Sequence, residues 1–173
     1  TMLYNQGYRS VVLAPGNYGE DFATNVLGIP PHRIVNMSNF VGHVLKEVQR
    51  IGFTRVLMVG HMGKFVKVAG GIFSTHSKDS DARMEIIMAN LALLGAPVEL
   101  LEKVDQCIAA GTLIEEYHYE EVYQVLVDKM KFRSERLLRN RKPEVSIDVV
   151  TFGTEAGYLA STQTLEEIAE EWT

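Results

Sequence analysis

The first sixty residues alternate between short apolar runs and segments with the periodicity of a helix. Runs rich in β-branched residues occupy 10–14 (SVVLA), 33–37 (RIVNM) and 54–60 (TRVLMVG). Between them, residues 20–27 and 39–51 place their apolar side chains on one helical face. Strand–helix–strand units with short loops form right-handed crossovers and lay their strands parallel in one sheet. The sequence therefore predicts an α/β fold, in which ligands bind at the carboxyl-terminal edge of the strands.

Beyond residue 60 the pattern becomes mostly helical. Helices are predicted at 80–94, 97–110, from Thr112 onward, at 120–139 and from Thr164 onward, and a fourth strand is predicted at 144–152. Thr112 and Thr164 each stand three residues before a glutamate, the spacing of a capping box. Residues 80–94 are apolar nearly all round, which predicts a buried helix. We therefore expect one Rossmann-like α/β domain over residues 1–173, with four or five mostly parallel strands flanked by helices and a helix-rich second half.

Composition narrows the classes of protein to which the chain can belong. Hydrophobic residues make up 46% of the 173 residues, enough for one domain with a proper core, and no apolar run could cross a bilayer. Lys and Arg number 17 against 22 Asp and Glu, and this negative balance argues against nonspecific nucleic-acid binding. The acidic end of the chain and the basic stretch 129–142 are interpreted as solvated helix faces. Cys107 is the only cysteine, so it excludes an internal disulfide, fits a reducing cytoplasmic compartment and is interpreted as structural.

The segment 59–85, which follows the third strand, is the strongest candidate for a binding site. It holds two histidines, four Lys or Arg residues, four glycines and three carboxylates. His61 stands between two glycines directly after the strand, where it could accept a proton or donate a hydrogen bond. Lys64 and Lys67 bring positive charge to the same strand end. No second histidine lies at ligand spacing and Cys107 is distant, so no metal site is predicted.

A polar cluster lies within this segment, before and at the start of the predicted helix 80–94. His76, Ser77 and Arg83 could bind carboxylates of a substrate, which arginine does through paired hydrogen bonds. Alternatively, Arg83 pairs with Asp79 or with a carboxylate from elsewhere and only satisfies polar groups at the start of a buried helix. Both interpretations stay open. A Ser-His-Asp hydrolase is disfavoured because the G-x-S-x-G elbow is missing.

The loop after the first strand reads APGNYGED and carries Gly16, Asn17 and Gly19. Its glycines would let a ligand approach the backbone, but their spacing is not the dinucleotide fingerprint. Glu20 and Asp21, expected in the first helical turn, would repel a phosphate. The loop therefore suits an uncharged nucleoside or an ammonium-bearing ligand, and a plain strand-to-helix turn is the alternative.

The loop after the second strand reads NMSN and carries Ser38 and Asn39. Many nucleoside-binding sheets place an acid here to hold the ribose hydroxyls. Ser38 and Asn39 could also bind hydroxyls, but Ser38 is equally suited to cap the next helix.

Three strings stand in an order that resembles one family. They are LAPGNYGEDFA at 13–23, NMSNFVG at 36–42 and VGHMGKFVKVAGGIFSTHSKDSDARMEI at 59–86. Together with IDVVTFG at 147–153, they resemble the C-terminal half of the CbiD family, the cobalt-precorrin-5B C(1)-methyltransferases of anaerobic cobalamin biosynthesis. The likeness is specific over the first three strings and looser beyond them.

The resemblance implies transfer of a methyl group from S-adenosylmethionine to a ring carbon, C1, of a multiply carboxylated corrinoid precursor that carries its own cobalt. The implied donor contacts are Gly16, Asn17, Gly19, Ser38 and Asn39. The implied contacts to the acid arms of the substrate are Lys64, Lys67, His76, Ser77 and Arg83. His61 would remove a proton or orient the acceptor. Methyl transfer depends largely on alignment, so no covalent protein intermediate is required.

The chain departs from this family in length, because the N-terminal half of family members is absent here. We therefore expect its partners to include that half or a second copy of this chain, and neither a nucleic acid nor a membrane. The alternative function is a noncatalytic fragment for ligand binding or assembly. A nicotinamide-dependent oxidoreductase domain is disfavoured because the glycine fingerprint is missing.

Overall fold

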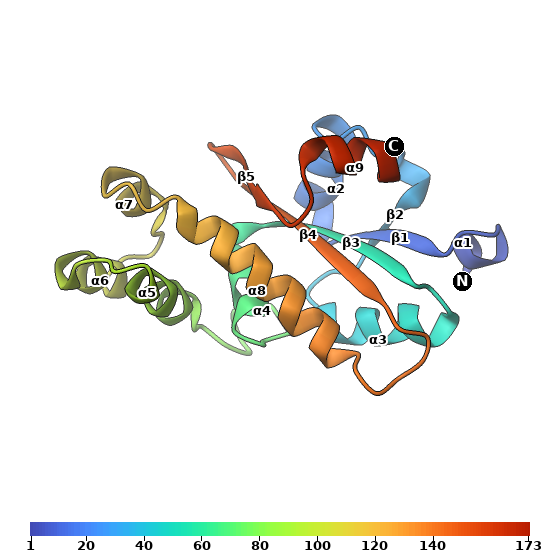
Figure 1. The fold of residues 1–173 in the computed structure, drawn as a ribbon, viewed down its shortest axis with the longest axis horizontal. Helices are drawn as coiled ribbons and strands as arrows, with labels where there is room; N and C mark the ends of the chain where they lie inside the picture. Colours follow the sequence, from blue (N-terminus) through green and yellow to red (C-terminus); the bar gives the residue numbers. More distant parts are fainter.

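The computed structural model describes residues 1–173, and a five-stranded sheet with helices on both faces forms its centre (Figure 1). The strands are β1 (Ser10–Ala14), β2 (Ile34–Asn36), β3 (Arg55–His61), β4 (Ser146–Gly153) and β5 (Gly157–Ser161). Their order is β2-β1-β3-β4-β5, with β1 to β4 parallel and β5 antiparallel to β4. This arrangement confirms the predicted α/β fold with a mostly parallel sheet.

Helices fill the connections and most of the second half, as the sequence predicts. They are α1 (Met2–Asn5), α2 (Gly16–Asn25), α3 (Val41–Ile51), α4 (Met62–Ala69), α5 (Arg83–Leu93), α6 (Val98–Asp105), α7 (Gly111–Glu116), α8 (Glu121–Leu137) and α9 (Leu165–Trp172), with a short 3-10 turn at Pro31–Arg33. None of these helices combines the length and the apolarity that a membrane span requires.

The alternation of side chains along the strands builds one core on each face of the sheet. On one face, Leu13, Met58 and Val149 pack with α3, α4 and α8 in the larger cluster. On the other face, Leu57 and Val150 pack with α2 and α9 in the smaller cluster. Because both faces are covered, β3 reads as a continuous apolar run rather than as an alternating one.

Helices α5, α6 and α7 form an arm that extends past the sheet and contacts the rest of the fold through α4 and α8 (Figure 1). The prediction of a buried helix at 80–94 is wrong in its extent. Only Ile87, Asn90 and Leu91 of α5 are buried, and Leu93 is 76% exposed. The arm packs on other helices rather than on the sheet, so part of the apolar surface of α5 faces solvent.

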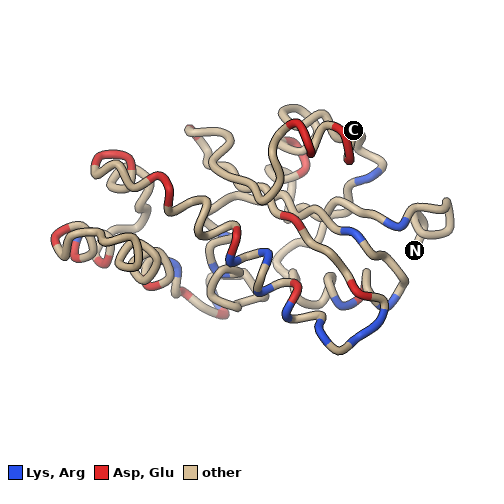
Figure 2. The backbone as a smooth tube through the Cα atoms, viewed as in Figure 1, with Lys and Arg blue, Asp and Glu red and all other residues tan.

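Charges separate along the molecule (Figure 2). Acidic side chains gather on α6, α7 and α9, whereas Lys and Arg follow the end of α8 and the loop that leads to β4. Glu166 and Glu170 of α9 are exposed, which agrees with the predicted solvated face. The basic loop contributes to two surface hollows.

The three predicted helix caps have different outcomes. The capping box at Thr164 is confirmed, because its hydroxyl accepts the Glu167 N–H while the Glu167 carboxylate accepts the Thr164 N–H. The box at Thr112 is wrong, since α7 begins at Gly111 without a side-chain cap. Ser38 does not cap α3 either: the helix begins at Val41, and Ser38 sits in the left-handed region at φ 51°.

Candidate functional site

The candidate site lies at the carboxyl-terminal edge of β1 and β3, where the strand order reverses. β1 leads through α2 to β2 on one side, and β3 lies on its other side. Helix α2 packs on one face of the sheet and α4, which follows β3, packs on the opposite face. The chain segments after β1 and β3 therefore diverge at a topological switch point, the place where open α/β sheets bind ligands.

Asn36, the last residue of β2, connects the loops after β1 and β2. Its Oδ1 accepts the Gly16 N–H at 3.1 Å and the Ser38 N–H at 2.8 Å. Gly16 has φ +67°, a conformation that favours glycine. The structure thus brings together Gly16, Asn17 and Ser38 from the predicted donor contacts, and the side chains of Asn17 and Ser38 are exposed.

Gly19 has a different place from the one predicted, because it packs against the sheet instead of facing a ligand. A Cβ at this position would stand 3.0 Å from both Ala14 Cβ and the Val59 carbonyl oxygen. Gly19 therefore lets α2 approach the sheet closely.

Helix α2 also begins at Gly16 rather than near residue 20, so Glu20 lies beyond the first turn, which holds no acidic residue. The predicted repulsion of a phosphate by that turn thus loses its basis.

Asn39 connects the loop after β2 with α4 and with the segment that follows α4. Its Oδ1 accepts hydrogen bonds from Lys64 Nζ at 3.4 Å and from Thr75 Oγ1 at 3.2 Å. Its carbonyl accepts the Thr75 N–H at 3.1 Å. The predicted donor contact Asn39 and the predicted substrate contact Lys64 therefore belong to one hydrogen-bonded group.

His61 ends β3 and caps the N-terminus of α4. Its Nδ1 accepts the Gly63 N–H at 3.0 Å, so Nε2 carries the proton and donates to Thr154 Oγ1 at 2.8 Å. The ring also meets Phe152 edge-on, with centroids 5.5 Å apart. Burial of the ring, and then the nearby charge of Lys64, lowers the pKa of His61. In this arrangement both ring nitrogens are occupied, which suits an orienting role better than proton removal.

Lys67 is buried, although the sequence predicts a contact to substrate. Only 2% of the residue is exposed, and Nζ donates to the carbonyls of Thr75 at 3.1 Å and Ser80 at 2.7 Å. The ammonium group therefore fastens the segment 75–80 to α4. Helical periodicity alone could not show that this side chain turns inward.

A Lys67→Ala substitution is expected to lower the free energy of unfolding by about 2 kcal/mol, because it leaves the buried Thr75 carbonyl and the partly buried Ser80 carbonyl without their donor. Urea unfolding followed by circular dichroism measures this change. Lys64→Ala is the matched control, since Lys64 is exposed and its loss should cost less than about 0.5 kcal/mol. Equal losses in the two variants would contradict the buried anchoring role.

His76, Ser77 and Arg83 lie in the segment that leads into α5. His76 and Ser77 are exposed, and His76 Nδ1 accepts the Lys78 N–H at 3.1 Å. Arg83 Nε lies 3.5 Å from Asp81 Oδ1, so its partner is not the predicted Asp79, whose carboxylate accepts the Ser74 hydroxyl instead. No hydrogen bond or ion pair joins these residues to His61 or to one another, and Arg83 is half-buried whereas His76 and Ser77 are exposed.

Several side chains at this edge were not among the predicted contacts. Asn36 and Thr75 hold the loops, and Thr154 receives the His61 hydrogen bond. Tyr18 and Phe40 are aromatic residues that are 80% and 61% exposed. Tyr18 and Phe40 could have been singled out from the sequence, because each is an aromatic residue within a polar, glycine-bearing string. Thr154 gave no signal, because it follows a strand that is distant in sequence. No group of three or more His, Cys, Asp or Glu side chains is placed to hold a metal.

Comparisons with known proteins agree on one family. A family model described as the C-terminal domain of CbiD matches residues 74–163. Cobalt-precorrin-5B C(1)-methyltransferase of Listeria welshimeri is 58% identical over 99% of this chain and 47% of its own length. The proteins of that name from Clostridioides difficile and Citrobacter koseri are 41% and 43% identical over 98% and 95% of this chain, and over 42% and 44% of their own lengths. The chain spans about half the length of the curated relatives it matches. No solved structure is significantly similar to it.

Proposed function

The chain belongs to the CbiD family through its C-terminal domain, and from this we propose that it forms part of an S-adenosylmethionine-dependent C-methyltransferase. The proposed reaction transfers a methyl group to carbon C1 of cobalt-precorrin-5B in anaerobic cobalamin biosynthesis, in the cytoplasm. The observation that carries this proposal is 58% identity, across 99% of the chain, to the cobalt-precorrin-5B C(1)-methyltransferase of Listeria welshimeri. The relatives' names support a methyl transfer to a cobalt-precorrin. S-Adenosylmethionine is proposed as the donor because its chemistry is that of a methyl donor.

We assign the donor to the loops after β1 and β2. S-Adenosylmethionine carries a ribose, an adenine and an amino acid, and it has no phosphate group. The exposed hydroxyl of Ser38 and the side chains of Asn17 and Asn39 suit ribose and amino-acid groups. The Asn36 amide holds Gly16 and Ser38 together, and Tyr18 is exposed nearby in α2. Gly19 is left out of the assignment because it packs against the sheet.

We assign the acid arms of the corrinoid to the cations that follow β3. Lys64 and Arg83 are the two predicted cationic contacts of this segment whose charged groups are not buried, with His76 and Ser77 as exposed hydrogen-bonding partners. Arg83 has only a 3.5 Å contact to Asp81, which is 73% exposed, so a substrate carboxylate could compete for it. Lys67 is left out because its ammonium is buried. The cobalt belongs to the substrate in this proposal.

His61 is proposed to orient the site. Its ring joins the end of β3, the start of α4 and the turn after β4 through the two hydrogen bonds at Nδ1 and Nε2. A fixed turn at the switch point would keep donor and acceptor aligned, which supplies most of the rate enhancement in a methyl transfer.

The alternative is a noncatalytic fragment that binds a ligand or takes part in assembly. It is favoured by one observation, that the chain covers only 47% of its Listeria welshimeri relative. Under this alternative, the region missing from this chain holds the donor and performs the chemistry.

Calorimetry with S-adenosylhomocysteine, S-adenosylmethionine and NAD separates these functions. We expect saturable binding of the first two and none of NAD. Asn36→Ala should weaken S-adenosylhomocysteine binding about tenfold or more, because it removes the bonds that hold Gly16 and Ser38. Asn25→Ala, an exposed position at the end of α2, is the matched control and should bind normally. Absence of binding to the two adenosyl compounds favours the fragment, and binding of NAD alone contradicts the methyltransferase.

A further inference from the structure

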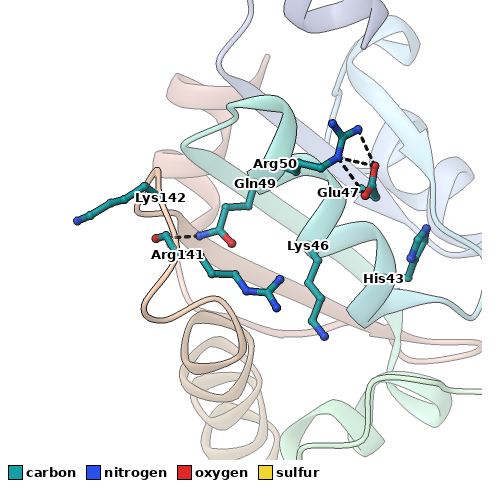
Figure 3. A pocket seen from close by; sticks show the side chains of 7 residues that line it. All are labelled: His43, Lys46, Glu47, Gln49, Arg50, Arg141 and Lys142. Carbon is teal, nitrogen blue, oxygen red and sulfur yellow. Dashed lines mark hydrogen bonds and ion pairs between the residues drawn. The ribbon is translucent and has the colours of Figure 1, made fainter.

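A hollow of about 380 Å³ lies at the amino-terminal edge of β3 and β4, opposite the candidate site (Figure 3). Its walls come from α3 and from the loop between α8 and β4, and no hydrophobic residue lines it. The basic residues at its surface are His43, Lys46, Arg50, Arg141 and Lys142. A second hollow of about 790 Å³ shares Arg141 and Lys142 and adds Arg139. Small-molecule ligands commonly bind in hollows of this size, but the polar lining of this one excludes an apolar ligand.

The loop that carries these cations is held in place by a buried side chain. Gln49 on α3 is only 2% exposed, and its Nε2 lies 3.1 Å from the Leu138 carbonyl, 3.3 Å from that of Arg141 and 2.8 Å from that of Pro143. The amide therefore fixes the backbone on both sides of Arg141. A fixed backbone lowers the conformational entropy that the loop loses when it binds a ligand.

Most of the cations at the hollow have no counter-charge. Arg50 is paired with Glu47 at 2.9 Å. Lys46, Arg141 and Lys142 make neither a side-chain hydrogen bond nor an ion pair in the structure. Figure 3 shows Arg141 and Lys46 extending their charged ends toward the same space, whereas Lys142 extends away from it. Two like charges that face one space repel each other, and an anion between them would remove that repulsion.

Helix dipoles do not explain this arrangement. Arg50 lies in the last turn of α3, where a cation complements the C-terminal partial charge. Arg141 and Lys142, however, lie beyond the end of α8 at Leu137, and Lys46 lies in the middle of α3. Their convergence in a chain with a net charge of −5 is therefore a local feature of this edge.

We propose that the hollow between α3 and the 138–145 loop binds a small multivalent anion, with Arg141 and Lys46 as its main contacts. Arginine binds phosphate and carboxylate groups through paired hydrogen bonds, and lysine adds a point charge. Phosphorylated metabolites and polycarboxylic acids share this chemistry. The site lies at the edge of the sheet opposite the switch point, so it does not depend on the proposed methyl transfer.

Titration calorimetry with tripolyphosphate and with citrate tests this site and distinguishes the two sources of anion. We expect one saturable site for at least one probe, and the tighter probe identifies the ligand class. Arg141→Ala and Lys46→Ala should each weaken binding about tenfold, and the double variant should abolish it. Both side chains are exposed, so the variants should keep the wild-type unfolding midpoint.

Arg136→Ala is the matched control, because Arg136 is an exposed arginine on α8 that does not line the hollow. It should bind the anion as wild type does, and all variants should bind S-adenosylhomocysteine unchanged. If Arg136→Ala weakened anion binding equally, the effect would come from the net charge of the protein alone, and the proposed site would be overturned. Failure of both anions to saturate the wild-type protein would overturn it as well.

Discussion

A His61→Ala substitution is expected to lower methyl transfer at least about tenfold in a hybrid protein, in which this chain replaces the matching half of the Listeria welshimeri relative. The imidazole joins Gly63 at the start of α4 to Thr154 after β4. Without it, the start of α4 and the turn after β4 lose a fixed contact. A displacement of about 1 Å in an aligned site can cost as much as a factor of about 100 in rate. Methylation of the corrinoid by the hybrid, compared with the unsubstituted hybrid, measures the effect.

A His61→Asn variant separates an orienting role from a proton-accepting one. Asparagine is a favoured N-cap, and its amide oxygen can still accept the Gly63 N–H, but it cannot titrate. An orienting role predicts that most of the rate returns, whereas a general base predicts that Asn is as poor as Ala. His43→Ala, an exposed position on α3, is the matched control. A folded His61→Ala hybrid with the unsubstituted rate would remove His61 from the mechanism.

The pH dependence of folding stability gives a second measure of the hydrogen bond between His61 and Gly63. Because the pKa of His61 is lowered in the folded state, its contribution to stability is present above the unfolded pKa. The contribution is lost as the pH falls through the folded pKa, when a proton on Nδ1 displaces the Gly63 N–H. The His61→Asn variant should lack this loss.

The sheet could be predicted from sequence because its four parallel strands are apolar runs and the first three alternate with amphipathic helices through short loops. The short helix α1 was not predicted, and two further elements, α4 and β5, were missed for physical reasons. Helix α4 begins at Met62 directly after β3, and its cap is the last residue of that strand, so no turn residue marks the boundary. Strand β5 is short and has only β4 as a neighbour at the edge of the sheet, with an uneven register between them. Its sequence, GYLAS, carries little strand signal without that neighbour.

The sheet edge that holds the candidate site could be predicted from sequence, but the side-chain contacts at that edge could not. Topology alone brings the ends of β1 and β3 to one edge, which is why His61 and Gly16 could be predicted to lie at the same edge. The direction of a long side chain depends on packing, so Lys67 and Lys64 looked alike although one is buried and the other exposed. The hollow between α3 and the 138–145 loop is formed by segments that are almost a hundred residues apart. A basic run in the sequence does not indicate which distant segment it will contact.

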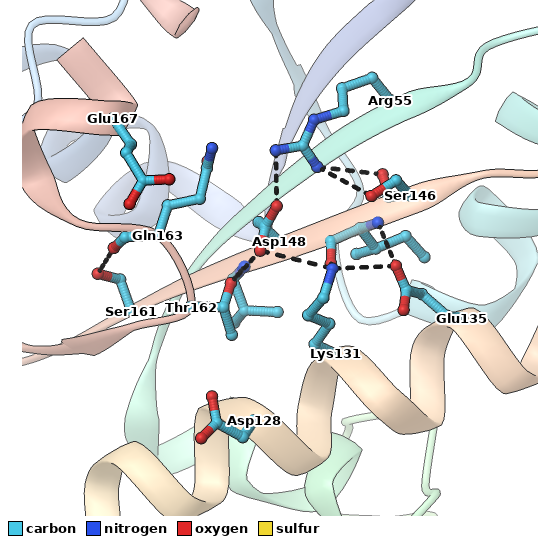
Figure 4. Close-up of polar contacts among 12 residues, drawn as sticks. Arg55, Asp128, Lys131, Glu135, Ser146, Asp148, Ser161, Thr162, Gln163 and Glu167 are labelled. Atoms are coloured by element: carbon cyan, nitrogen blue, oxygen red, sulfur yellow. Dashed lines mark hydrogen bonds and ion pairs between the residues drawn. The ribbon is translucent and has the colours of Figure 1, made fainter. Parts of the chain in front are cut away.

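An Asp148→Asn substitution is expected to lower the free energy of unfolding by about 3 kcal/mol. Asp148 lies on β4 with a side chain that is 11% exposed, and its carboxylate meets Arg55 at 2.6 Å and Lys131 at 3.6 Å (Figure 4). The Thr162 hydroxyl donates to it at 2.5 Å. Arg55 in turn binds Glu171 of α9 through two hydrogen bonds of 2.6 and 3.0 Å. Loss of the Asp148 charge therefore weakens a network that joins α8, β3, β4 and α9.

Urea unfolding measures this loss, and Glu47→Gln is the matched control. Glu47 also pairs with an arginine, but its side chain is 41% exposed and that of Arg50 is 69% exposed. Such surface pairs contribute about 0.5 kcal/mol or less. An Asp148→Asn protein that unfolds at the same urea concentration as the control would show that the network adds nothing beyond a surface ion pair.

The same network should make the fold sensitive to acid. Burial acts to raise the pKa of Asp148, but the Thr162 hydroxyl, Arg55 and Lys131 outweigh it and hold the pKa below its usual value. The pKa of Glu171 is also lowered, by Arg55 and Gln163 against the opposing effect of burial. Both carboxylates therefore stabilise the fold above their unfolded pKa values, and this stabilisation is lost as the pH falls through the folded values. The Asp148→Asn protein should lose less stability than wild type over that acidic range, since one of the two carboxylates no longer takes up a proton on unfolding.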